Sequence, residues 1–157
     1  LQVDFRSAVS LVKRCLPLME RQGSGRIVAV TSLAAKIGAP LRTGYCAAKH
    51  ALQGFCDALR PEVASLGIAV TVVVPGFVRT EISRHALTGG GRPHGRMDPL
   101  QERGISPEAC ARDILRAIRR GKAEVKSGFG LKGWLALFLS RVSVGVYSRL
   151  IAGSREL

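Results

Sequence analysis

The sequence is poor in acidic and aromatic residues. Only 11 Asp and Glu stand against 24 Lys and Arg among 157 residues, so the net charge is +13, and aromatic residues make up 5%. Such a charge suits nucleic acid, an anionic membrane or an acidic ligand. The basic residues are spread along the chain, however, without the interleaved aromatic side chains or the signature of a nucleic-acid module. We therefore expect no nucleic-acid partner.

Paired ligand patterns are also missing. The four cysteines form no CxxC pair and the histidines show no HxxxH spacing. Three of the cysteines fall in apolar helical patterns, where a thiol behaves as a small hydrophobe. We predict no metal site and a reducing, intracellular setting, either the cytoplasm or the cytoplasmic face of a membrane such as the endoplasmic reticulum.

The first twenty residues carry a helical pattern that has no start signal. Apolar residues recur near helical spacing, but neither an initiator Met nor a capping residue precedes them. We interpret the chain as a piece of a longer one. Its length suits at most one domain with one substantial core.

Two apolar, β-branched runs predict buried parallel strands at 26–32 and 68–76. The intervening residues 43–66 have the spacing of a helix, which Pro61 should bend. Strand, helix and strand in this order form a right-handed crossover of an α/β sheet. Ligands of such sheets bind at the carboxyl ends of the strands, which here are Thr31 with Ser32 and Pro75 with Gly76.

The second half of the chain combines a polar connection, a helix, a short strand and an apolar tail. The polar, Gly-rich residues 77–105 predict either a mobile flap over a site or a disordered connection. Residues 106–121 predict a helix, with Ser106 as N-cap and Pro107 at its first position, and 122–128 predict one more strand. The tail 131–153 has one helical pattern with Arg141 at its centre, so it should not span a membrane.

The stretch TGYCAAKHALQGF places Tyr45 four residues before Lys49, which brings both to the same face of a helix. A neighbouring cation favours the phenolate form of a tyrosine, so Tyr45 could pass a proton to or from a substrate oxygen. Ser32, thirteen residues earlier, would hydrogen-bond the same oxygen. None of these residues moves a hydride, so the chemistry requires a bound cofactor.

The TS pair at 31–32, the spacing to YCAAK at 45–49, and PGFVRT at 75–80 together resemble the classical short-chain dehydrogenase/reductase (SDR) family. The resemblance implies a Rossmann-like doubly wound parallel α/β sheet. This chain would lack the N-terminal nucleotide-binding strands of that sheet. Residues 1–130 would be the catalytic half and 131–157 an amphipathic helix or tail.

The resemblance also implies roles for particular residues. Ser32, Tyr45 and Lys49 would be catalytic, and Tyr45 and Lys49 would also contact the cofactor. Other cofactor contacts would come from Pro75, Gly76, Val78 and Thr80. The cofactor would be NADP or NAD, with NADP slightly favoured. The choice between them stays open because the residues that make it lie upstream. The fourth catalytic position, an Asn in the family, falls on Asp4, and an ionised Asp accepts hydrogen bonds but cannot donate them.

Residues 87–99, the helix at 106–121 and the tail look like the membrane-associated member-seven subgroup of this family. That likeness suggests a small apolar, lipid-like alcohol or carbonyl substrate. In this family the opening helix and the Tyr45 helix pair in a homodimer. The tail could lie on an anionic membrane surface or pack against the domain or its dimer mate.

Two functions remain open at this stage. One is an NAD(P)-dependent oxidoreductase acting on an apolar alcohol or carbonyl. The other is a non-catalytic, membrane-associated interaction protein that keeps the fold. In the second case Tyr45 and Lys49 would be a surface pair, Ser32 a strand-end cap and Asp4 a helix-face carboxylate.

Overall fold

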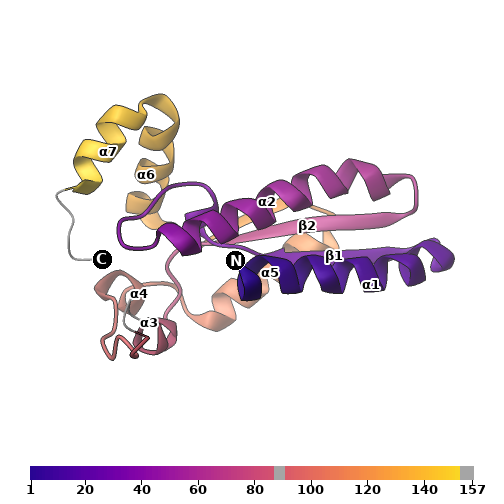
Figure 1. Ribbon diagram of the computed structural model, residues 1–157, viewed down its shortest axis with the longest axis horizontal. Helices are drawn as coiled ribbons and strands as arrows, with labels where there is room; N and C mark the ends of the chain where they lie inside the picture. The colour runs from indigo at the N-terminus through magenta and orange to yellow at the C-terminus, as the bar shows by residue number, and fades with distance from the viewer. Residues whose placement is uncertain (87–90, 153–157) are drawn as a thin grey trace.

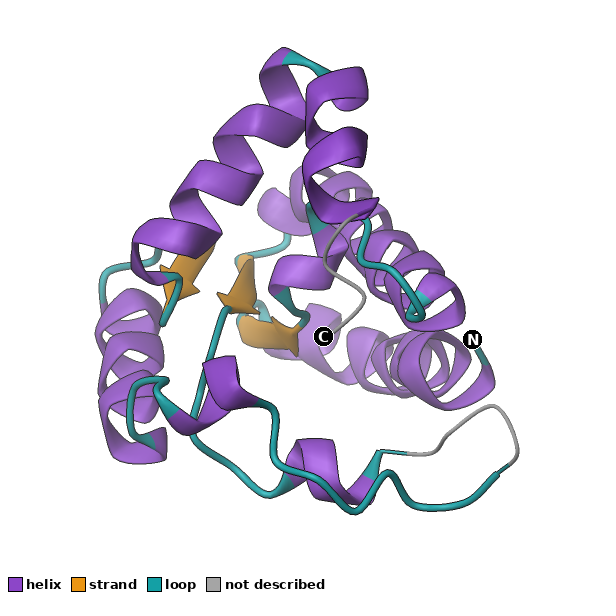
Figure 2. Cartoon of the chain, turned by 90° about the vertical axis from the view of Figure 1, so that its left-hand side faces the viewer, coloured by secondary structure: helices purple, strands orange, loops and turns teal. Residues whose placement is uncertain are grey.

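The computed structural model describes residues 1–86 and 91–152 and contains a three-stranded parallel sheet in the order β1-β2-β3. The strands are β1 (Gly25–Val30), β2 (Ile68–Pro75) and β3 (Glu124–Ser127). Helices α1 (Ser7–Gln22) and α2 (Thr43–Ala64) cover one face, and α5 (Pro107–Arg119) covers part of the other (Figures 1 and 2). The predicted α/β class and parallel sheet are confirmed.

The central strand β2 holds the core. Val72, Val73 and Val74 are fully buried because helices cover both faces of this strand and another strand flanks each edge. The register pairs Ile27 with Val70 and Val73 with Val125. Gly67, at φ 72°, precedes β2, and a side chain there would collide with the carbonyl oxygen of Gly23. This close approach lets the turns before β1 and β2 lie side by side.

Strand β1 departs from its prediction, because it is not covered on both faces. Ile27 is buried under the helices, but Val28 and Val30 are 36% and 52% exposed. Among the described residues, β1 pairs only with β2, and α5 packs against β2 and β3 instead. The outer face and outer edge of β1 are therefore open in this chain.

The predicted helix starts and stops are largely observed. The chain opens with a π-helical turn, η1 (Gln2–Arg6), that continues into α1. The hydroxyl of Ser106 accepts a hydrogen bond of 3.2 Å from Ala109 N and so caps α5, as expected. Pro61 lies inside the last turns of α2, and β3 occupies most of the predicted strand at 122–128.

The segment 77–105 contains two short helices, α3 (Ile82–His85) and α4 (Pro99–Glu102). Its two ends are joined where Arg79 N donates to Ile105 O at 2.9 Å and Ile105 N donates to Phe77 O at 3.1 Å. Part of the predicted flap, 87–90, lies outside the described residues. Whether the segment moves as a flap stays a prediction.

The tail is not one helix. It forms α6 (Gly130–Val142) and α7 (Val144–Ala152), separated at Ser143, whose backbone is extended at φ −154° and ψ 106°. The prediction of a continuous helix is wrong because Tyr147 turns back to the body, where its hydroxyl donates to the carbonyl oxygen of Gly38 at 2.5 Å. No helix in the described part of the chain is both long enough and apolar enough to cross a membrane.

Candidate active site

Tyr45 and Lys49 lie one turn apart near the start of α2, where the strands end (Figure 1). Cys46 and Ala48, the residues between them on the other side of the helix, are buried and fix this turn against the core. Lys49 Nζ lies 5.5 Å from the centre of the Tyr45 ring, within reach of a cation–π attraction. The predicted proximity of the two side chains is observed.

Asp4 reaches the same group from η1. Phe5 packs edge-to-face on Phe55 of α2, with ring centres 6.4 Å apart at 81°, which holds η1 against the helix. In this position Asp4 Oδ1 lies 3.2 Å from Lys49 Nζ. The Lys49 side chain is 12% exposed and that of Asp4 is 40% exposed, so the pair sits at the border between core and solvent. Three of the four predicted catalytic residues therefore form one cluster.

Ser32 follows the end of β1 and begins a turn of 3₁₀ helix, η2 (Leu33–Ala35), that packs against α2. Its Oγ accepts a hydrogen bond of 3.2 Å from Ala34 N, which makes it the cap of η2. Within the described residues, no hydrogen bond joins Ser32 to Tyr45 or Lys49. Because Oγ acts as an acceptor here, its hydroxyl hydrogen remains available for donation.

The four residues predicted to line the cofactor follow the end of β2. Gly76 N donates to Ser127 O at 2.8 Å, and a Cβ on Gly76 would lie 2.5 Å from the Gly128 carbonyl oxygen. Gly76 thus has a packing reason to be glycine. Val78 forms an isolated bridge with Ile105, and Pro75 and Thr80 are half-buried. Their contact with a cofactor stays a prediction.

The polar groups of the cluster fit the ribose and nicotinamide end of a dinucleotide. A lysine ammonium has three N–H donors, and the ion pair of Lys49 with Asp4 on one side leaves donors available for ribose hydroxyls. The hydroxyls of Tyr45 and Ser32 are not bound to each other or to Lys49 and could meet a substrate oxygen. The adenosine and pyrophosphate end is not assigned to any residue of this chain.

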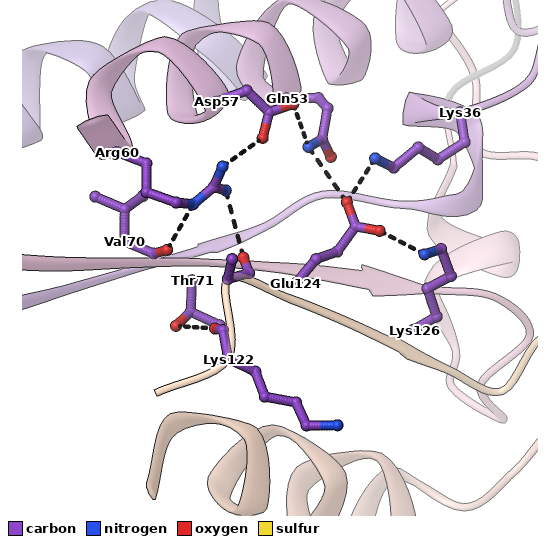
Figure 3. A network of polar contacts seen from close by, with 10 residues as sticks. Lys36, Gln53, Asp57, Arg60, Val70, Thr71, Lys122, Glu124 and Lys126 are labelled. Carbon is purple, nitrogen blue, oxygen red and sulfur yellow. Dashed lines mark hydrogen bonds and ion pairs between the residues drawn. The ribbon is translucent and has the colours of Figure 1, made fainter. Parts of the chain in front are cut away.

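A polar network next to the cluster was not anticipated from the sequence. Lys36 Nζ lies 2.5 Å from Glu124 Oε2 and Lys126 Nζ lies 2.6 Å from Glu124 Oε1, so both ammonium groups converge on one carboxylate (Figure 3). Gln53 Nε2 donates to Asp57 at 2.8 Å and lies 3.5 Å from Glu124. Lys36 lies in the connection between Ser32 and Tyr45, so β3 anchors this connection. The only sequence signal was one lysine in the apolar stretch SLAAKIGAP.

The two hollows and the side chains that could bind a metal do not indicate a different active site. Two open hollows of about 320 and 300 Å³ lie at the amino ends of the strands, around Gly67 and Ala69, away from Tyr45. They contain none of the predicted catalytic side chains. Within residues 1–86 and 91–152, no group of three His, Cys, Asp or Glu is placed to hold a metal ion.

Comparison with known proteins defines the class to which this fold and cluster belong. A family model described as short chain dehydrogenase matches residues 1–89, which include Asp4, Ser32, Tyr45 and Lys49. The chain belongs to the short-chain dehydrogenase/reductase family.

Two curated relatives are similar to the chain over most of its length. The chain is 45% identical over 123 residues to a dehydrogenase/reductase SDR family protein 7-like of Anopheles gambiae, covering 78% of this chain and 39% of the relative. It is 40% identical over 152 residues to dehydrogenase/reductase SDR family member 7B of Danio rerio, covering 97% and 49%. The expected likeness to the member-seven subgroup is confirmed. The chain spans less than half the length of these relatives.

Solved structures support the fold. A short chain dehydrogenase of Burkholderia cenocepacia in complex with NADP superposes with a TM-score of 0.72 at 20% identity, covering 95% of this chain and 56% of that one. A short-chain dehydrogenase of Streptomyces avermitilis gives 0.71 at 22% identity, covering 98% and 60%. The Rossmann-like sheet is thus established, with this chain corresponding to part of it.

Proposed function

We propose that this chain is the catalytic half of an NAD(P)-dependent oxidoreductase that acts on a small apolar, lipid-like alcohol or carbonyl. The observation that carries the proposal is the cluster of Asp4, Tyr45 and Lys49 at the carboxyl end of the strands. A bound nicotinamide cofactor would accept or supply the hydride. NADP and NAD both remain candidates.

The protein's own residues would handle the proton. In the reductive direction, Tyr45 Oη would donate a proton to the substrate oxygen while the Ser32 hydroxyl donates a hydrogen bond to it. Lys49 would hold ribose hydroxyls and stabilise the negative charge that remains on Tyr45. Asp4 would hold Lys49 in place from the other side, through the 3.2 Å contact. In the oxidative direction the same groups act in reverse.

Variants of Tyr45 and Lys49 in the complete protein test these roles. Tyr45→Phe removes only the hydroxyl, so turnover of an apolar ketone should fall by roughly 100- to 10,000-fold while nucleotide affinity is retained. Lys49→Ala should reduce both turnover and affinity, because Lys49 has two roles. Stopped-flow turnover and fluorescence titration with NADH and NADPH measure the two quantities.

The matched control is Lys13→Ala, which removes an exposed lysine of α1. It should change neither quantity. Full turnover in Tyr45→Phe, or loss of nucleotide binding in that variant, would reject the proton-transfer role.

The Lys49–Asp4 ion pair also favours a second candidate, an interaction protein that keeps the fold without turnover, because it occupies part of the lysine's binding capacity. In that case the complete wild-type protein would bind neither NADH nor NADPH saturably.

For either function we propose a homodimer formed through α1 and α2. Leu11 and Leu18 of α1, 64% and 51% exposed, would support such pairing. Sedimentation of wild type and a Leu11→Glu variant would test it.

A further inference from the structure

The outer side of α6 is an apolar stripe that faces away from the core. Its members recur every three or four residues and are more than half exposed, at 86%, 53%, 63% and 66%: Leu131, Leu135, Phe138 and Val142. Trp134, beside them, is 52% exposed. The opposite side of α6 is buried through Gly133 and Leu137. The apolar stripe is therefore a solvent-facing surface, distinct from the side of α6 that packs against the core.

Helix α7 carries further exposed apolar side chains. It exposes Val144, Val146 and Leu150 by 71%, 46% and 58%, whereas Tyr147 is buried and bound to Gly38. Leu137 and Tyr147 thus hold the helix pair on the body, at the end of the molecule where the strands end (Figure 1). We call the exposed apolar side chains of α6 and α7 the tail surface.

The charges carried by α6 and α7 themselves have one sign. From residue 125 to residue 155 the sequence contains no Asp or Glu, yet it carries Lys132, Arg141 and Arg149 within α6 and α7. Exposed apolar residues beside long cationic side chains and a half-exposed tryptophan are typical of helices that lie in a membrane interface.

A second copy of the chain fits the surface less well. A twofold contact would bring this patch against itself and so place its cations together, and neither helix carries a carboxylate to balance them. Anionic lipid headgroups supply the missing charge, and the acyl boundary accepts the apolar stripe. The length of α6, about 20 Å at 1.5 Å per residue, is too short to span a bilayer.

We propose that α6 and α7 together dock on an anionic lipid membrane surface. Leu131, Leu135 and Phe138 enter the acyl boundary, and the flanking cations contact headgroups. Docking does not depend on the oxidoreductase activity. It would place the candidate active site close to the membrane, because both lie at the same end of the sheet.

The single tryptophan of the 157 residues, Trp134, provides the probe. Vesicles of phosphatidylcholine with roughly 30% phosphatidylserine should blue-shift its emission, and the affinity should exceed that for phosphatidylcholine alone by about 100-fold, given three cations. Added salt should weaken the binding.

Matched double variants separate specific docking from general attraction by the net charge. Leu135→Gln with Phe138→Gln removes two apolar side chains of the tail surface, and Leu115→Gln with Ile82→Gln removes two comparably exposed ones of α5 and α3, at 52% and 62%. Neither pair changes the charge. Flotation with the same vesicles should show a loss of roughly tenfold or more for the first pair and little change for the second. Far-UV circular dichroism verifies that all the proteins keep the same helicity.

Three outcomes would overturn the proposal. Equal vesicle binding by both double variants would show adsorption by charge alone. A concentration-dependent dimer without lipid that only the Leu135, Phe138 variant dissociates would show that a second copy covers the surface. Shielding of Trp134 from acrylamide in the lipid-free complete protein would show that another part of the protein covers it.

Discussion

Two lysines near α2 are each paired with a carboxylate, but their surroundings differ. Lys36 and Glu124 are 11% and 25% exposed and 2.5 Å apart, and Glu124 also binds Lys126. Lys49 and Asp4 are 12% and 40% exposed and 3.2 Å apart, and no second cation contacts Asp4 among the described residues. The first pair is largely satisfied by its neighbours, whereas the second keeps donors and an acceptor for other molecules. We therefore expect the first pair to contribute to stability and, under the proposed function, the second to take part in the reaction.

The largest effect within this comparison should come from Glu124→Gln. Without the carboxylate, the ammonium groups of Lys36 and Lys126 face each other in a partly buried site, so the free energy of unfolding should fall by about 2 to 3 kcal/mol. Urea denaturation of the variant and wild type measures the change.

The control is Glu81→Gln, which breaks the Glu81–Arg84 pair, whose side chains are 59% and 53% exposed. Its effect should stay below about 1 kcal/mol. If both substitutions lower stability equally, the Glu124 network is no more than a surface ion pair.

Local signals in the sequence predicted the parts of the fold that local physics decides. The run of valines in β2 predicts a covered strand, and Ser106 with Pro107 predicts the start of α5. The open face of β1 was missed because its β-branched residues look the same whether or not a helix covers them. The break at Ser143 was missed because it depends on Tyr147 reaching Gly38, which is 109 residues away.

The candidate site was only partly predictable, because some of its contacts join residues that are far apart in the sequence. One helical turn brings Tyr45 to Lys49, so their spacing alone suffices. Asp4 was assigned to the fourth catalytic position by the resemblance alone, since no local pattern links a residue of η1 to α2. Lys36 and Glu124 lie 88 residues apart, and nothing in either segment marks the other as its partner.

The second prediction concerns the Lys49–Asp4 pair and the turnover rate. Asp4→Asn in the complete protein should raise turnover by about tenfold, which is about 1.4 kcal/mol of barrier. A water held beside Lys49 needs both a donor and an acceptor to stay oriented, and an amide offers both whereas a carboxylate only accepts. Loss of the carboxylate's attraction for Lys49 opposes this gain, and we expect it to be the smaller term.

Initial rates at saturating nucleotide across roughly pH 6 to 9 measure this change. Glu20→Gln, which removes an exposed carboxylate of α1, is the charge-matched control and should leave the rate unchanged. An equal or lower rate for Asp4→Asn throughout that range would return Asp4 to the role of a helix-face carboxylate.

The smallest effect is the pH dependence of the Glu124 network. Burial by itself raises the pKa of the Glu124 carboxyl, but hydrogen bonds from Lys126 and Lys36, with their charges, outweigh it and hold the pKa below its ordinary value. A carboxyl with a lowered pKa in the folded state contributes stability above its unfolded-state pKa. That contribution is lost as the pH falls through the folded-state pKa.

Wild type should therefore lose more unfolding free energy than Glu124→Gln when urea denaturation is repeated from roughly pH 7 down to pH 3. The two curves should approach each other toward the acidic end, because only the protonated fraction of Glu124 resembles glutamine and its lowered pKa keeps that fraction incomplete. Glu108, whose pKa is also lowered, keeps its surroundings in both proteins, so its contribution cancels in the difference, whereas Asp57 shares Lys36 and Gln53 with Glu124 and belongs to the same network. A difference that stays constant over this range would mean that the network stabilises the fold through packing and neutral hydrogen bonds. In that case the contrast with the Asp4 pair would not be one of charge.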